Sequence, residues 1–173
     1  MGTIIVTAPA SSLVLPVTMP GITLRAISDA DRPFLARLYA STREAEMRMT
    51  GWDDAQQSIF LQSQFAAQQH AYLAYPDAVF LMVRRDGEPI GRLYVQTLAD
   101  RLHVVDISLL PAAREGGVGT ALMRAVIAAG KASGKGVGLH VEASNRALTW
   151  YRRLGFEAVA QKGFYLEMRR EGS

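Results

Sequence analysis

A glycine-rich heptapeptide, Arg114 to Thr120, holds the residues most able to bind a ligand. It reads Arg-Glu-Gly-Gly-Val-Gly-Thr and separates an apolar, β-branched run from a segment of helical periodicity. Glycines at the start of a helix let the backbone approach a ligand, and the N–H groups of the first turn lie at the positive end of the helix dipole. The segment therefore predicts an anion site and favours a phosphate ligand.

Two common glycine loops are excluded by residue type. The mononucleotide loop requires Lys and then Ser or Thr after its last glycine, whereas Thr120-Ala121 follows here. The dinucleotide loop requires a third glycine where Leu122 stands. What remains is the pattern Arg-x-x-Gly-x-Gly, which is formed by Arg114, Gly117 and Gly119.

A second motif follows the glycine loop by about one strand and one helix. Asn145 is a good helix N-cap, and Gly155 is a good residue for the position just after a helix. Between them, Ala147, Tyr151 and Leu154 share one helix face at positions i, i+4 and i+7. The predicted helix would therefore anchor the Tyr151 ring and direct its phenol away from the helix.

Together the two motifs resemble those of the GNAT superfamily of N-acetyltransferases, most closely over residues 102–156. The resemblance implies acetyl-CoA as cosubstrate, with its pyrophosphate on the N–H groups of the loop and its pantetheine arm on the backbone of the preceding strand. The cosubstrate-binding residues that it implies are Leu109, Leu110, Arg114, Glu115, Gly116, Gly117, Val118, Gly119, Thr120, Asn145, Ala147 and Tyr151.

Acetyl transfer from a thioester to an amine needs a positioned amine, a proton acceptor, an oxyanion donor and a proton for the thiolate. By the resemblance Tyr151 supplies that last proton, and the Leu110 N–H is a candidate oxyanion donor. Asp106 is the first candidate for the base, because it stands in an otherwise apolar strand. His103, Glu142 and a water molecule stay open as alternatives.

The acceptor is predicted to be the primary amine of a small molecule or peptide. The resemblance places residues 41–52 beside the acceptor pocket, where the carboxylates of Glu44 and Glu46 would attract an ammonium group. The alternative is a non-catalytic acyl-CoA-binding module used for sensing or assembly. Tyr151 favours an enzyme, since a sensor needs no proton donor for a thiolate.

The elements that must position these residues follow from the hydrophobic periodicity. Strands are predicted at 22–27, 78–85, 89–97, 102–110, 137–143, 157–161 and 164–170, and helices at about 33–39, 53–75, 118–129 and 145–155. This order predicts an α/β domain of three layers with a mixed, mostly antiparallel sheet of about seven strands. The resemblance to GNAT proteins adds that two strands splay apart at the acetyl-CoA cleft.

Length and composition suit one domain. The chain has 173 residues, of which 49% are hydrophobic. We expect residues 21–173 to form the domain and residues 1–20 to form an extended arm, which is either packed on the domain or on a partner subunit of a homodimer, or partly disordered. Three prolines and the absence of Lys and Arg argue against a signal peptide in that arm.

Composition also excludes several classes of function. The chain has no cysteine, which excludes disulfides, thiolate metal sites and a cysteine nucleophile. The absence of cysteine also favours a cytoplasmic location. Its three histidines have no metal-ligand spacing, so no metal is predicted. A net charge of +3, without a basic tail, does not support a nucleic-acid partner. No apolar run is long enough to predict a membrane span.

Overall fold

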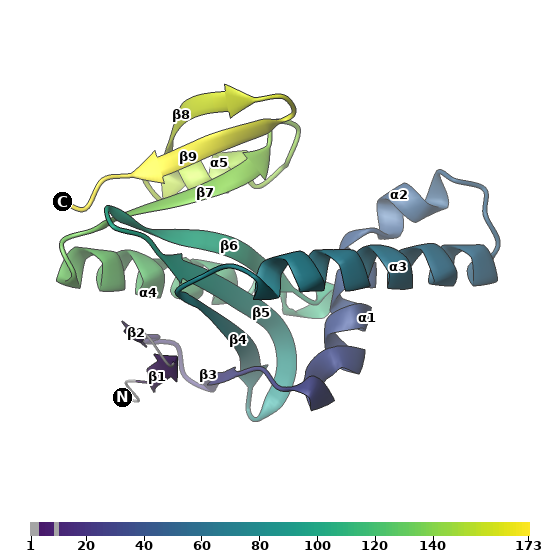
Figure 1. Cartoon of the computed structure of the whole chain (residues 1–173), viewed down its shortest axis with the longest axis horizontal. Helices are drawn as coiled ribbons and strands as arrows, with labels where there is room; N and C mark the ends of the chain where they lie inside the picture. The colour runs from purple at the N-terminus through teal and green to yellow at the C-terminus, as the bar shows by residue number, and fades with distance from the viewer. Residues whose placement is uncertain (1–3, 9–10) are drawn as a thin grey trace.

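Seven strands form one sheet in the computed structural model, which describes residues 4–8 and 11–173 and the side chains from residue 12 onward. The strand order is β3-β4-β5-β6-β7-β9-β8, and every neighbouring pair is antiparallel except β6 with β7. The strands are β3 (Ile22–Ala26), β4 (Ala78–Arg85), β5 (Glu88–Thr97), β6 (Arg101–Leu109), β7 (Gly136–Glu142), β8 (Glu157–Lys162) and β9 (Tyr165–Arg170). The predicted fold class is confirmed (Figure 1).

Five α-helices accompany the sheet in the described part of the chain. They are α1 (Arg32–Thr42), α2 (Glu44–Arg48), α3 (Asp54–Leu73), α4 (Val118–Ala132) and α5 (Leu148–Arg153), and short 3₁₀ turns at Asp29–Asp31 and Pro111–Ala113 precede α1 and α4. Helix α2 lies between the predicted helices at 33–39 and 53–75, where no helix was predicted. Its acidic first residue Glu44 and basic last residue Arg48 form an i,i+4 pair at 3.4 Å, in the orientation that favours a helix.

Strict alternation along β4 and β5 separates two hydrophobic cores, one on each face of the sheet. Leu81 and Leu93 are fully buried in the core that includes α4 and α5. Met82, the residue after Leu81 in β4, joins the smaller core that α1 and α3 build with Phe65 and Leu38. Since successive side chains of a strand point to opposite faces, the sheet is the middle of three layers.

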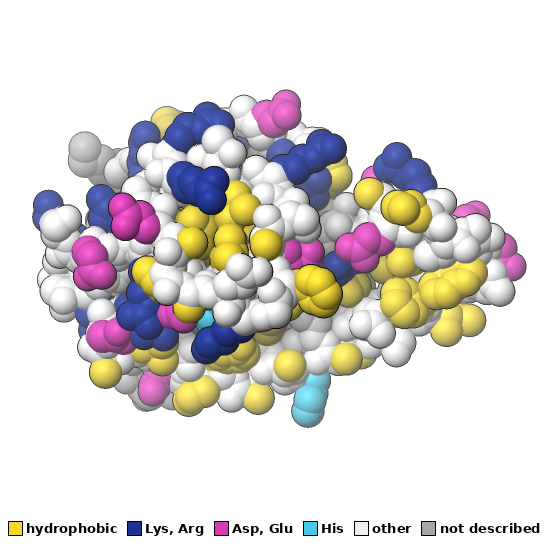
Figure 2. Space-filling view, turned by 90° about the horizontal axis from the view of Figure 1, so that it is seen from above, with side chains coloured by type: hydrophobic (Ala, Val, Ile, Leu, Met, Phe, Trp, Pro, Cys, Tyr) yellow, Lys and Arg dark blue, Asp and Glu magenta, His cyan; other side chains and the backbone are white. Residues whose placement is uncertain are grey.

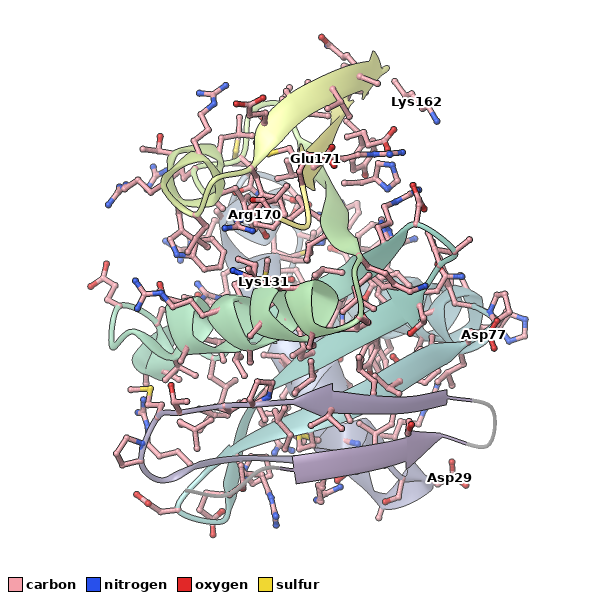
Figure 3. All side chains as sticks on the ribbon, turned by 90° about the vertical axis from the view of Figure 1, so that its left-hand side faces the viewer. Asp29, Asp77, Lys131, Lys162, Arg170 and Glu171 are labelled. Atoms are coloured by element: carbon pink, nitrogen blue, oxygen red, sulfur yellow. The ribbon has the colours of Figure 1, made fainter. Side chains whose placement is uncertain are left out.

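The predicted N-terminal arm folds as a hairpin on the same domain. Strands β1 (Ile4–Ala8) and β2 (Ser11–Leu15) pair antiparallel and form a small sheet of their own. Leu13, Leu15 and Val17 are buried in the core shared with α4. Figure 3 shows the hairpin running beside α4, the helix that carries the labelled Lys131. Residues 1–3 and 9–10 of the arm lie outside the described residues.

A β-bulge in β6 decides which of its side chains face α1 and α3. Tyr94 of β5 pairs with Asp106, but the next residue, Val95, pairs with Val104, so Val105 is an extra residue in β6. Before the bulge, Val104 faces the α4 core, and after it Leu109 does. Asp106 is therefore turned out of the α4 core and toward α3, because a bulge shifts the alternation by one residue.

Strands β6 and β7 separate beyond the bulge. Their parallel pairing runs only from Arg101 with Gly136 to Val104 with Leu139. Residues 105–109 of β6 then have no strand on this side, and Figure 1 shows the two ribbons diverging. The expected separation of two strands is therefore present, and it opens the sheet beside the glycine loop.

Candidate active site

A cleft of about 410 Å³ opens where β6 and β7 separate. It is lined by residues from α1, α2 and α3, from the strands β5, β6, β7 and β9, and from the α5 region. Most of these residues are polar, and among those predicted from the sequence are Glu46, Asp106, Glu142, Asn145 and Tyr151. The fold therefore brings together side chains that lie about a hundred residues apart in the chain.

Asp106 is held in the cleft by a dense set of hydrogen bonds. The Arg92 guanidinium donates to its carboxylate from Nε at 3.2 Å and from Nη2 at 3.0 Å. The hydroxyl of Tyr72 donates at 3.1 Å, and that of Ser108 at 2.6 Å. A carboxylate has about four lone-pair sites, so these four bonds leave it little capacity to accept a further hydrogen bond.

Arg92 is the buried partner of that ion pair, with only 2% of its surface exposed. Its guanidinium carbon lies 5.6 Å from the centre of the Tyr72 ring and 5.1 Å from that of Tyr94. Its Nη2 also donates to Gln68 at 2.7 Å. Burial raises the pKa of the Tyr72 hydroxyl, and the Asp106 carboxylate raises it further, so this hydroxyl remains a donor.

The end of α5 places Tyr151 through a Schellman motif. Gly155 has a φ of +89°, which glycine adopts without strain. Its N–H donates to the Arg152 carbonyl at 3.0 Å, and the Phe156 N–H donates to the Tyr151 carbonyl at 3.1 Å. The Phe156 and Tyr151 rings then pack edge to face, with 5.9 Å between their centres. The predicted role of Gly155 at the helix end is therefore confirmed.

The start of α5 differs from the prediction by three residues. Asn145 does accept a backbone hydrogen bond, from the Ala147 N–H at 2.8 Å, but it caps a turn and not the helix itself. The regular helix begins at Leu148. Asn145 was a candidate cap because its side-chain chemistry is local, but the N-cap of the helix is Ala147, since the extra turn depends on how the chain leaves β7.

The phenol of Tyr151 faces the cleft from a buried ring. The residue is 8% exposed and packs against Trp150, with ring centres 4.8 Å apart. Burial, and to a smaller extent the Asp106 carboxylate, raise the pKa of Tyr151 to about 12. Among the described residues no hydrogen-bond partner is found for its hydroxyl. It is therefore a protonated donor available to a ligand.

The glycine loop forms a backbone cradle at the start of α4. Glu115 and Gly117 both have positive φ, +65° and +82°. The first helical hydrogen bond runs from the Ala121 N–H to the Gly117 carbonyl at 3.0 Å, and no backbone partner is found within the described chain for the N–H groups of residues 118–120. A Cβ added to Gly117 would meet no atom within 4 Å. An anion could therefore approach these donors directly, as a phosphate site requires.

A model of the acetyltransferase (GNAT) family matches residues 40–156. The chain belongs to the GNAT acetyltransferase family. No curated protein sequence matches it.

Solved structures of GNAT proteins share the fold. The PaiA N-acetyltransferase from Thermoplasma acidophilum, in complex with coenzyme A, has a TM-score of 0.66 at 16% identity, over 87% of this chain and 98% of that one. The ribosomal-protein-S18-alanine N-acetyltransferase from Escherichia coli has a TM-score of 0.60 at 20% identity, over 88% and 94%.

In this GNAT domain the hydrogen bonding of β6 contradicts the prediction that the Leu110 N–H is an oxyanion donor. The Leu110 N–H donates to the Ile90 carbonyl at 2.8 Å, so it faces β5 and is not free as an oxyanion donor. Because N–H directions alternate along a strand, the Leu109 N–H points to the open side instead. The Leu109 carbonyl accepts a bond from Nε of Arg114 at 3.0 Å. Of these two residues, Leu109 therefore keeps its N–H for a ligand in the gap.

Trp150 joins the two GNAT motifs, a contact that the sequence did not reveal. Its indole N–H donates to the Thr120 hydroxyl oxygen at 3.0 Å. A Cβ added to Gly119 would lie 3.5 Å from the indole ring. The helix that carries Tyr151 is therefore fixed directly to the first turn of α4.

The two acidic residues predicted for the acceptor side have different positions. Glu46 lines the cleft, where it accepts a bond from the Arg43 guanidinium at 2.8 Å. Glu44 pairs with Arg48 and borders a shallow depression between α1 and α3 instead. The structure therefore brings Glu46, but not Glu44, to the other cleft residues.

Of the alternative bases, Glu142 lines the cleft and His103 does not. Glu142 is exposed and forms no ion pair with any described residue. His103 is buried with its ring centre 5.0 Å from that of His140, and burial lowers its pKa to about 4. His103 is therefore neutral near pH 7 and separated from the site.

Sequence reasoning missed Arg92 and the α3 side chains that surround it. A signal was present in β5, where Arg92, Tyr94 and Gln96 alternate with apolar residues. Such alternation predicts one polar face of a strand, and a buried polar face needs partners. The partners Gln68 and Tyr72 lie on a separate helix, so the pairing itself could not be predicted.

An apolar surface adjoins the α2 side of the cleft. Figure 2 shows hydrophobic side chains gathered at the end of the molecule formed by α2 and the start of α3. Met49 is 89% exposed, and Trp52 packs edge to face on Phe60.

No helix in the described part of the chain is long and apolar enough to cross a membrane. Within the same residues, no group of three or more His, Asp or Glu side chains could hold a metal ion.

Proposed function

We propose that the chain is an acetyl-CoA-dependent N-acetyltransferase that acts on the primary amine of a small molecule or peptide. The observation that carries this proposal is Tyr151, whose phenol has no partner among the described residues and faces the gap between β6 and β7, while its neighbour Trp150 contacts the glycine loop. A proton donor is thus fixed relative to a phosphate cradle. The coenzyme A in the PaiA structure and the alanine acceptor in the name of the E. coli protein guide the choice of ligands.

The residues present fit acetyl-CoA, which would supply the reactive thioester. The free N–H groups of residues 118–120 would bind the pyrophosphate, and the Leu109 N–H would bind the pantetheine arm in the strand gap. Asn145 and Ala147 support α5 from the adjacent turn. Tyr151 would donate its proton to the sulfur as the C–S bond breaks.

We assign the proton acceptor to Glu142, directly or through a water molecule. Its carboxylate lines the cleft without an ion pair among the described residues, whereas that of Asp106 is occupied by Arg92. An unpaired carboxylate attracts an ammonium group and can accept its proton before the amine attacks. Asp106 then has a positioning role, because it fixes Arg92, Tyr72 and Ser108 along the cleft wall.

The assignment predicts different losses in two isosteric variants. Glu142→Gln should fold normally and lose about 10²-fold in kcat/KM. Asp106→Asn should destabilise the fold by about 3 kcal/mol or more, because it leaves Arg92 buried without its anion. Chemical denaturation measures the loss of stability, and steady-state kinetics measure the loss of kcat/KM. A folded Glu142→Gln enzyme with kcat/KM within about threefold of the wild type would contradict the assignment.

The function itself is tested by coenzyme A release across a panel of polyamines, amino acids, aminoglycosides and peptides. Thiol release that depends on both acetyl-CoA and one class of amine is the expected result. Tight acetyl-CoA binding by calorimetry without thiol release for any amine would instead support the sensing or assembly module. Neither binding nor release would reject both.

A further inference from the structure

A guanidinium from outside both motifs lies beside the glycine loop. Arg85 is the last residue of β4, and its Nη2 would lie 3.6 Å from a Cβ added to Gly116. The sheet makes this approach possible, because Gly91 of β5 pairs with Leu109 at the end of β6. The turn between β4 and β5 therefore lies beside the residues that lead from β6 into the glycine loop.

This guanidinium has no anionic partner in the described part of the chain. Arg85 takes part in none of the ion pairs or side-chain hydrogen bonds found there, and it is half-buried. Arg43 and Arg92, the arginines of the cleft, are both paired with carboxylates. Even the nearby carboxylate of Glu115 is exposed and forms no ion pair with Arg85.

The position of Arg85 is electrostatically unfavourable unless an anion binds there. The N-terminus of α4 carries a partial positive charge and free N–H donors, and a guanidinium beside it adds a full charge of the same sign. An anion between them would be attracted by both. Arginine suits this task, since its planar donors match two phosphate oxygens at once.

We propose that Arg85 binds the pyrophosphate of acetyl-CoA, opposite the N–H groups of the loop. The inference rests on the proposed function and extends it, because it adds a binding residue from β4 that neither motif contains. The loop would thus supply directional N–H donors, and Arg85 would supply the compensating charge.

The test compares Arg85→Ala and Arg85→Lys with the wild type, and Arg37→Ala, an exposed arginine of α1, is the matched control. Calorimetry with coenzyme A should show about tenfold to a hundredfold weaker binding for Arg85→Ala, the scale of a lost charged hydrogen bond. Arg85→Lys should retain part of the affinity. None of the variants should melt at a lower temperature than the wild type.

Truncated ligands locate the contact. With dephospho-coenzyme A, which keeps the pyrophosphate, the loss should be the same. With S-acetylpantetheine, which lacks it, Arg85→Ala and the wild type should have equal KM values. Unchanged coenzyme A affinity in a folded Arg85→Ala protein, or an equal loss with S-acetylpantetheine, would overturn the inference. Failure of the wild type to bind coenzyme A would instead reject the proposed function.

Discussion

Replacing Tyr151 with Phe isolates the phenol from the packing of its ring. The ring contacts with Trp150 and Phe156 are kept, and so is the Schellman motif, which uses only backbone groups at this position. The lost hydroxyl has no hydrogen-bond partner among the described residues. Because removal of an unpaired hydroxyl leaves no partner unsatisfied, we expect the free energy of unfolding to change by less than about 1 kcal/mol.

The catalytic loss should be much larger. A positioned general acid contributes about 10²-fold or more to the rate, so kcat of Tyr151→Phe should fall by at least that factor while acetyl-CoA affinity is retained. The pKa of Tyr151, raised to about 12 by burial, also sets the pH dependence. At pH 8 only about one phenol in ten thousand would be ionised.

The ratio of the wild-type rate to the Tyr151→Phe rate should therefore stay constant up to about pH 10 and decline only near pH 12. A phenol with an ordinary pKa near 10 would be half ionised at pH 10, and this ratio of rates would already be halved there. Initial rates of thiol release, measured with both enzymes at each pH, give this ratio. The ratio cancels any ionisation that the two enzymes share.

Two results would refute the reasoning. One is a kcat within about threefold of the wild type, under conditions where single-turnover kinetics show that chemistry limits the rate. The amine or water would then supply the proton, and Tyr151 would be structural. The other is a large loss of stability in Tyr151→Phe, which would mean that the hydroxyl makes a bond in solution.

Two further predictions concern the cradle and the stability of the fold. Gly117→Val should abolish acetyl-CoA binding, and Gly134→Val is its control, because both glycines have positive φ and no atom within 4 Å of an added Cβ. Both variants should lose about 1–2 kcal/mol of stability from backbone strain, but only the first should lose calorimetric binding. The Asp31 carboxylate accepts bonds from Arg25 at 2.6 and 2.7 Å, and this partner, more than any other, lowers the pKa of Asp31 to about 2. A lowered pKa stabilises the folded state above the unfolded value of 3.8 and ceases to do so as pH falls through 2. Asp31→Asn should therefore flatten the stability profile between pH 5 and about 2 in denaturant titrations, and an unchanged acid slope would contradict this.

Local patterns in the sequence determined most of the sheet and the positions of both motifs. Each predicted strand of the sheet agrees with the structure to within one residue at either end. The helix after the glycine loop begins at Val118 as predicted, and Gly155 ends α5. These features depend on side-chain period and on the backbone freedom of glycine, which a few neighbouring residues specify.

Tertiary structure alone decided which residues of the site contact one another. The bulge at Val105 turns Asp106 from the α4 core toward α3, and it exists only because β6 pairs with β5 in that register. The same pairing engages the Leu110 N–H. Arg92 meets Asp106, and Arg85 reaches the glycine loop, across strands that adjoin only in the folded sheet. Strand register is a non-local choice, set by the packing of both faces at once, so no window of sequence could contain it.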